Sequence, residues 1–202
     1  MTDKKFLQTV YDLSTPQQAR DLYNNWAATY DDEIRENGYV TPQRIADALA
    51  RHLTDKEAAI LDFGCGTGLS GVALKSAGFQ VFDGADLSAD MLKGAQAKGI
   101  YRSLWQVDPG ADVPTGYAAV TAMGVIGNGA APLSVFDTLL NSLATGGLFA
   151  LSFNDNTLAE PKYEAHLRGS IDSGATRLLF QEYGPHLPGI NLKANVYILE
   201  KL

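Results

Sequence analysis

Cysteine and positive charge are both scarce in this chain of 202 residues. Cys65 is the single cysteine, so no intrachain disulfide can form and nothing in the sequence calls for an oxidising compartment. Sixteen Lys and Arg residues face 23 Asp and Glu residues, which gives a net charge of −7. A negative net charge disfavours binding to phosphate backbones, so we expect no nucleic-acid partner.

Long hydrophobic runs are absent as well. No segment approaches the roughly 18 apolar residues of a membrane-spanning helix, and the first residues lack the apolar stretch of a signal peptide. We therefore expect a cytoplasmic protein with no membrane partner. The 3 histidines form no HxH or HxxxH pair, so we also predict no metal site.

The chain length fits one domain, and the order of its elements predicts an α/β fold. Residues 1–56 are expected to form an N-terminal helical cap, with one helix over 15–38 and another from residue 41, and residues 57–202 the main part of the same domain. From residue 58 onward, short apolar runs alternate with helical stretches, which indicates a parallel sheet with helices on both faces. The expected strands are 59–61, 79–85, 101–107, 117–123 and 148–153, and the expected helices are 67–77, 88–99 and 132–143.

The C-terminal part has a different pattern. Residues 176–183 and 192–199 are predicted to be two strands joined by the Gly- and Pro-rich segment 184–189. A hairpin of this kind is antiparallel. We expect a mostly parallel, doubly wound sheet that ends in an antiparallel hairpin.

A glycine-rich turn directly after the first parallel strand is the most informative segment. It reads Asp62-Phe63-Gly64-Cys65-Gly66-Thr67-Gly68 and opens a helix. Residues 66–71 also fit G-x-G-x-x-G, and Asp86 stands 20 residues after Gly66, as a dinucleotide-binding fingerprint requires. The carboxylate of Asp62 would repel a pyrophosphate but suits a ligand that carries an ammonium group.

Four segments of the chain resemble motifs of class I S-adenosylmethionine-dependent methyltransferases of the small-molecule branch. The resemblance is strongest to the methyltransferase-like proteins of the Williams–Beuren region. Residues 62–68 resemble the first motif of that family and residues 84–91 the second. Residues 26–31 are similar to its Trp-Ala-x-x-Tyr-Asp entry helix, and residues 117–127 to its fourth motif. The resemblance covers roughly residues 20–155. It implies a Rossmann-like sheet with strand order 3-2-1-4-5-7-6 under an N-terminal helical lid.

The resemblance also implies S-adenosylmethionine as cofactor, S-adenosylhomocysteine as product, and a role for each matching residue. Asp62 would hold the α-amino group, Asp86 the two ribose hydroxyls and Asp108 the adenine amino group, although Pro109 has no N–H to offer the adenine ring. The implied cofactor-binding set is Trp26, Tyr30, Asp62, Gly64, Cys65, Gly66, Gly68, Asp86, Leu87, Met91, Asp108, Met123, Gly124 and Val125.

Catalytic residues are much less evident than cofactor residues. Methyl transfer from a sulfonium depends mainly on positioning, and a base is needed only where the acceptor must lose a proton. His166 and His186 are candidate bases, with a surface position as the simpler interpretation of each. Residues 121–126 lack the Asn/Asp-Pro-Pro-aromatic tetrapeptide of nucleic-acid amino methyltransferases.

Three functions therefore stay open at this point. The first is O-, N- or S-methylation of a small molecule. The second is a nicotinamide-dependent oxidoreductase that uses the overlapping G-x-G-x-x-G. The third is a noncatalytic module that binds S-adenosylmethionine.

Overall fold

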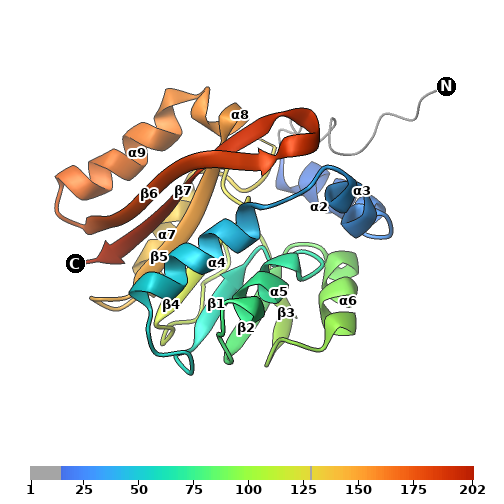
Figure 1. Cartoon of the computed structure of the whole chain (residues 1–202), viewed down its shortest axis with the longest axis horizontal. Coiled ribbons are helices and arrows are strands. Elements are labelled where there is room, and N and C mark those ends of the chain that lie inside the picture. Colours follow the sequence, from blue (N-terminus) through green and yellow to red (C-terminus); the bar gives the residue numbers. More distant parts are fainter. Residues whose placement is uncertain (1–14, 128) are drawn as a thin grey trace.

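The computed structural model describes residues 15–127 and 129–202. Residues 1–14 of the expected helical cap lie outside the described residues, and the division of the chain at residue 56 stays a prediction. The described residues form a seven-stranded sheet with helices on both faces (Figure 1). No helix in this part of the chain is both long enough and apolar enough to cross a bilayer.

The strands follow the order β3-β2-β1-β4-β5-β7-β6 across the sheet. Strands β1 to β5 pair in parallel, whereas β7 pairs antiparallel with both β5 and β6. The predicted fold class, strand order and antiparallel hairpin are confirmed. The strands are β1 Ile60–Phe63, β2 Phe82–Asp86, β3 Leu104–Gln106, β4 Ala119–Ala122, β5 Leu148–Asn154, β6 Thr176–Leu187 and β7 Leu192–Lys201.

Capping residues set the ends of the crossover helices. The Ser88 hydroxyl accepts the Met91 N–H at 3.1 Å at the start of α6, and Gly99 ends this helix with a left-handed φ of 61°. Both ends lie where the sequence predicts them. The helices are α4 Thr41–His52, α5 Leu69–Ser76, α6 Ala89–Lys98, α7 Ser134–Ser142, α8 Asp155–Leu158 and α9 Pro161–Asp172.

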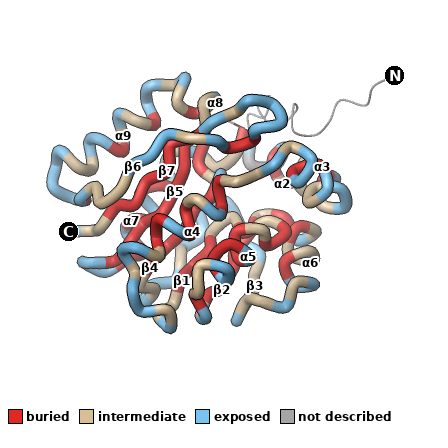
Figure 2. The backbone as a smooth tube through the Cα atoms, in the orientation of Figure 1, coloured by how far each residue is buried: buried red, intermediate tan, exposed pale blue. Residues whose placement is uncertain are grey.

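The core has a layer on each face of the sheet. Ile60 and Leu61 are both 0% exposed, because successive residues of a strand point to opposite faces and both faces are covered. Helices α4 and α5 cover the Ile60 face, and α7 and α9 cover the Leu61 face. Figure 2 shows the buried backbone concentrated in the central strands β1, β2, β4, β5 and β7, with the exposed segments on the outer sides of the helices.

The N-terminal segment differs from the single helix predicted over 15–38. It forms two helices, α2 Pro16–Trp26 and α3 Tyr30–Glu36, separated by a turn in which the Thr29 N–H donates to the Trp26 carbonyl at 3.0 Å. No Gly or Pro in the turn signals the break. Tertiary contacts explain it: α2 packs on α6, whereas Asp31 of α3 contacts the glycine-rich turn. A straight helix would carry Asp31 along the axis of α2 and away from that turn.

The hairpin also differs from the prediction in its tip. Strand β6 continues through Gly184 and Pro185 to Leu187, and a short 3₁₀ turn, Pro188–Ile190, makes the connection. Proline is tolerated there because β6 is the edge strand, and the register shifts by a bulge between Pro185 and Leu187. This extension carries His186 to the start of α4, where the Val40 N–H donates to the His186 carbonyl at 3.1 Å.

Candidate functional site

The glycine-rich turn joins β1 to α5 at the carboxyl edge of the sheet. Gly64, Gly66 and Gly68 have φ values of 70°, 54° and 94°, which side chains rarely adopt. A Cβ on Gly64 would lie less than 3.0 Å from Val125, so the first glycine is required for a close approach to the segment after β4. The turn therefore presents bare backbone to the space above the sheet.

Asp86 ends β2 and fixes this turn. One of its carboxylate oxygens accepts the Gly66 N–H and the other accepts the Ser88 N–H, each at 2.8 Å. The residue is 9% exposed, and burial raises the pKa of its carboxyl to about 6. Because each carboxylate oxygen has two lone-pair sites, both can accept a further hydrogen bond from a ligand.

Asp62 lies beneath the turn. Its carboxylate accepts hydrogen bonds from the hydroxyls of Ser70 at 2.5 Å, Tyr101 at 2.7 Å and Thr121 at 2.8 Å. The side chain is fully buried, and burial raises its pKa above the usual range. Tyr101 extends the network, because its hydroxyl also accepts the Gly71 N–H at 3.0 Å. The network ties β1, β4 and α5 together below the glycines.

A cavity of about 220 Å³ lies over the turn, and we call it the larger cavity. Ten of the fourteen predicted cofactor residues line it, namely Tyr30, Gly64, Gly66, Asp86, Leu87, Met91, Asp108, Met123, Gly124 and Val125. They come from α3, from the ends of β1, β2 and β4, and from α6 and the loop after β3. The structure thus brings together residues that are up to 95 positions apart in the sequence.

Four predicted residues are outside the lining of the larger cavity. Asp62 lies in the hydroxyl network described above, and Cys65 is 3% exposed beside Gly84, where burial raises its thiol pKa well above the usual range. Gly68 caps α5, and a Cβ there would lie 3.1 Å from the Ala95 backbone. Trp26 faces a neighbouring, smaller cavity. Direct cofactor contacts by all fourteen residues stay predictions.

Sequence reasoning missed several residues of the larger cavity. Phe63 stands inside the first motif, which could therefore have indicated it, and Tyr23 of α2 lies one helical turn before the predicted residue Trp26. The other missed residues carry no chemical signal of their own. They are Ala19, Val107, Pro109, Gly110, Ala111, Val113, Ala130, Ala131, Pro132, Ser134, Val135 and Thr138.

The smaller cavity, of about 70 Å³, adjoins the larger one. Tyr23, Tyr30, Gly124 and Ala130 line both cavities, so the two meet at these residues. The rest of its lining is Trp26, Ile34, Tyr39, Ile126, Gly127, Ser152, Asn154, Thr157, His186 and Leu187.

The structure separates the two histidine candidates. His186 is buried and lines the smaller cavity, and its Nδ1 lies 2.8 Å from the Thr41 hydroxyl oxygen. Burial lowers the pKa of His186 to about 4, so its ring is neutral at physiological pH. His166 instead pairs with Asp137 at 2.7 Å between α9 and α7, and it is absent from the linings of both cavities.

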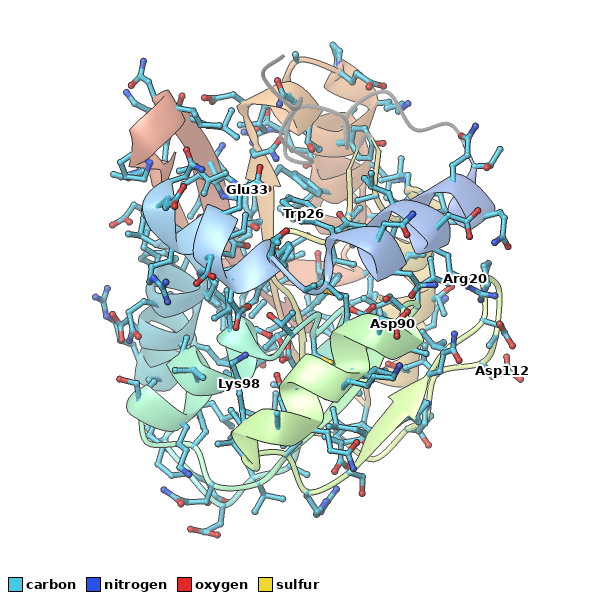
Figure 3. The ribbon with its side chains drawn as sticks, turned by 90° about the vertical axis from the view of Figure 1, so that its right-hand side faces the viewer. Arg20, Trp26, Glu33, Asp90, Lys98 and Asp112 are labelled. Carbon is cyan, nitrogen blue, oxygen red and sulfur yellow. The ribbon has the colours of Figure 1, made fainter. Side chains whose placement is uncertain are left out.

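Helices α2 and α3, which we call the lid, lie over the carboxyl edge of the sheet. Arg20 of α2 pairs with Asp108 at 2.7 Å, and the Ser88 hydroxyl donates to the side chain of Asn24 at 2.6 Å. Figure 3 shows Arg20 on α2, above the loop that follows β3. These contacts attach α2 to both sides of the larger cavity.

Asp31 attaches α3 to the glycine-rich turn. Its carboxylate accepts the Thr67 hydroxyl, and Lys98 of α6 donates to Asp31 and to the Thr67 carbonyl, each at 2.7 Å. Figure 3 shows Lys98 on α6, below the lid, with Trp26 and Glu33 close together inside it. The Trp26 indole N–H donates to Glu33 at 2.9 Å, which holds α2 and α3 to each other.

Fold and site together define a Rossmann-like domain with a ligand cavity at the glycine-rich turn and an antiparallel hairpin at the end of the sheet. The sequence pattern of a family described as a methyltransferase domain matches residues 35–186. The chain belongs to this methyltransferase domain family.

A similar curated protein is the methyltransferase-like protein 27 of Homo sapiens. It is 32% identical over 157 residues, which are 75% of this chain and 63% of that protein. The chain therefore matches less than two thirds of the length of this relative.

Solved structures with the same fold are more distant in sequence. One is magnesium protoporphyrin IX methyltransferase of Synechocystis PCC 6803 with bound SAH, with a TM-score of 0.70, 18% identity, and coverage of 93% of this chain and 100% of that one. Another is a putative RNA methyltransferase of Pyrococcus horikoshii, with a TM-score of 0.60, 13% identity, and coverage of 78% and 80%. At these identities the likeness concerns the fold alone.

The contact between Gly71 and Tyr101 gives a first prediction. Gly71 lies inside α5, where Gly→Ala ordinarily stabilises a helix by about 1 kcal/mol. A Cβ at this position would lie less than 3.0 Å from the Tyr101 ring and hydroxyl. We expect Gly71→Ala to lower the free energy of unfolding by about 1–3 kcal/mol, measured by urea denaturation.

Gly169→Ala is the matched control, because Gly169 lies inside α9 with open space at its Cβ position. We expect this change to stabilise the protein by up to about 1 kcal/mol. Stabilisation by both changes would contradict the packing described for Tyr101.

The bridge from Lys98 to Asp31 gives a second prediction. Lys98→Met removes the ammonium group that joins α3 to α6 and to the glycine-rich turn. We expect the amides of α3 to exchange about fivefold faster, because a partly exposed ion pair contributes up to about 1 kcal/mol to local stability. Hydrogen exchange followed by mass spectrometry measures this rate.

Lys93→Met serves as the control, since Lys93 lies on the same helix but pairs only locally, with Asp90. Equal exchange of α3 in both variants and the wild type would show that Lys98 does not hold the lid.

Proposed function

We propose that the chain binds S-adenosylmethionine in the larger cavity and transfers the methyl group to a small-molecule acceptor in the smaller cavity, by O-, N- or S-methylation. One observation carries this proposal: the glycine-rich turn and Asp86 line a cavity that joins a second cavity at Tyr23, Tyr30, Gly124 and Ala130. A transfer reaction needs two adjoining sites of this kind, one for each reactant.

The chemistry of the larger cavity fits this cofactor. The buried carboxylate of Asp86 is an acceptor-only group, which suits the vicinal hydroxyls of a ribose. Leu87 and Met91 offer apolar surface for the adenine, and Asp108, held by Arg20, stands at the same end of the cavity. Gly64 and Gly66 leave room for the methionine moiety against bare backbone. We assign the α-amino group to Asp62 or to the carbonyls of the turn above it.

Methyl transfer depends mainly on the orientation of the two reactants and on the exclusion of water. S-adenosylmethionine, when bound, supplies a methyl group on a positively charged sulfur that is a good leaving group. The lid covers the cavities and fixes the two sites relative to each other, and such positioning can contribute about 7–11 kcal/mol to the lowering of a barrier. Tyr30 lines both cavities, so we expect its ring to shield the sulfur from solvent.

The nicotinamide alternative has less support. It depends on residues 66–71, and Gly71 contacts Tyr101 instead of the cavity. Membership of a methyltransferase domain family and the terminal antiparallel hairpin also favour methyl transfer. A noncatalytic S-adenosylmethionine-binding module would share the larger cavity, but it has no need of the adjoining smaller one.

A small molecule is the acceptor that best suits the chain. The net charge of −7 disfavours a phosphate backbone. The smaller cavity has a volume of only about 70 Å³, and the lid, β6 and α8 all contribute residues to its walls. The Asn/Asp-Pro-Pro-aromatic tetrapeptide of nucleic-acid amino methyltransferases is absent from residues 121–126.

The role of Asp86 gives the third prediction. Asp86→Asn should weaken binding of S-adenosylhomocysteine at pH 8 by about 10–100-fold, since hydrogen bonds to a charged group contribute about 1.5–3 kcal/mol. Calorimetric titration measures the Kd. Asp90→Asn, four residues further on at the exposed start of α6, is the control and should leave the Kd unchanged.

The same titration has a predictable pH dependence. The pKa of Asp86 is raised to about 6, and ligand hydroxyls favour its ionised form. The wild-type Kd should therefore rise as the pH falls through 6, by up to about tenfold per pH unit, and stay flat above pH 7. If the Kd of Asp86→Asn kept the same pH dependence, Asp86 would not be part of the ligand site.

A further inference from the structure

The described lining of the smaller cavity is aromatic and has no charged side chain. Four aromatic side chains line it, those of Tyr23, Trp26, Tyr30 and Tyr39, and no Asp, Glu, Lys or Arg belongs to its described lining. Its volume of about 70 Å³ corresponds to room for about five water molecules. These properties favour an uncharged acceptor with a single flat ring over a cation or a polycyclic molecule.

His186 is the only histidine in the described lining of the smaller cavity, and its neutral ring can accept a proton. The lining has no carboxylate, and burial raises the pKa of Tyr30 well above its usual range, so that its phenol stays protonated. The His186 ring lies edge-on to Tyr39, with 5.1 Å between ring centroids. The charged side chains that influence it are Arg44 of α4 and Asp155 of α8.

Thr41 sets the orientation of the His186 ring. Thr41 is 0% exposed at the first position of α4, and its hydroxyl oxygen lies 2.8 Å from Nδ1. In the tautomer that donates from Nδ1 to Thr41, the lone pair is on Nε2. The bulge in β6 and the start of α4 thus hold the ring from two sides.

We infer that the smaller cavity binds a single-ring aromatic acceptor with a hydroxyl group, and that His186 Nε2 takes the proton of that hydroxyl during transfer. This inference rests on the proposed function and narrows it to O-methylation. An amine acceptor fits less well, because its ammonium form would lie beside the sulfonium, and the described lining itself has no carboxylate to compensate the charge.

The step balances in atoms and charge. The hydroxyl oxygen bonds to the methyl carbon, the electron pair of the broken carbon–sulfur bond stays on sulfur, and the hydroxyl proton passes to His186 Nε2. The neutral ring is available for this step because burial keeps the pKa of His186 near 4. As the carbon–oxygen bond forms, the hydroxyl becomes far more acidic than the ring. The proton then leaves the imidazolium for solvent.

The test uses phenol and 4-nitrophenol as acceptors, with S-adenosylhomocysteine formation as the readout. For phenol, His186→Gln should lower kcat by about 10²-fold, the lower end of the usual contribution of a general base because a pKa near 4 makes the ring a weak base, and change KM by less than about threefold. For 4-nitrophenol, assayed at a pH where it is ionised, the loss should shrink to less than about fivefold, because there is no proton to remove. An equal loss with both acceptors would mean a structural role and would overturn the assignment of His186.

The matched control is His166→Gln, which removes the histidine that is outside both linings and should change phenol turnover by less than twofold. Acceptor binding is measured in a separate experiment, by tryptophan fluorescence. The chain has 2 tryptophans, so Trp105→Phe leaves Trp26 as the single reporter in the smaller cavity. Phenol should quench this reporter in the Trp105→Phe variant with and without His186→Gln.

Calorimetry with S-adenosylhomocysteine distinguishes failure of the hydroxyl inference from failure of the proposed function. If S-adenosylhomocysteine binds but phenol neither quenches Trp26 nor is methylated, the hydroxyl inference is wrong and the proposed function stands. Turnover of benzylamine in place of phenol has the same meaning. If S-adenosylhomocysteine itself does not bind, the proposed function fails together with the inference.

Discussion

The buried carboxylate of Asp86 holds the functional end of this molecule in place. By accepting the Gly66 N–H and the Ser88 N–H, it fixes the glycine-rich turn after β1 and the start of α6 after β2 relative to each other. Ser88 then caps α6 and donates to Asn24 of the lid. The turn, the helix and the lid are thus connected through two neighbouring side chains, Asp86 and Ser88. Burial makes Asp86 a weaker acid, with a pKa of about 6.

The lid makes further contacts with the turn that the Asp86 carboxylate fixes. Asp31 joins α3 to the same turn through Thr67, and Arg20 joins α2 to Asp108 at the other side of the larger cavity. The lid also provides Tyr23 and Tyr30, which border both cavities. One pair of helices therefore closes the larger cavity and shapes the smaller one, so cofactor and acceptor sites depend on the same packing. A change in the lid is expected to affect both.

The sequence predicted the sheet and ten of the residues that line the larger cavity, because those features depend on local patterns. Glycines at fixed spacing, an acidic residue after β2 and a terminal hairpin can each be read from neighbouring residues. The hydroxyl network around Asp62 could not, because Tyr101 and Thr121 reach it from positions 39 and 59 residues away. Similarly, the break between α2 and α3 depends on the contacts of Asp31 with Thr67 and Lys98, which are distant in the sequence. The site of His186 depends on a β-bulge next to Pro185 that no local pattern indicates.

A crystal structure of the protein with S-adenosylhomocysteine is the most direct test of the central claim. We expect both ribose hydroxyls on the carboxylate of Asp86 and the adenine beside Leu87 and Met91. We expect the sulfur near Gly124 and Tyr30, facing the smaller cavity. A ligand bound outside the larger cavity would contradict the central claim. So would a sulfur that points away from the smaller cavity, because the two cavities would then not be successive parts of one reaction site.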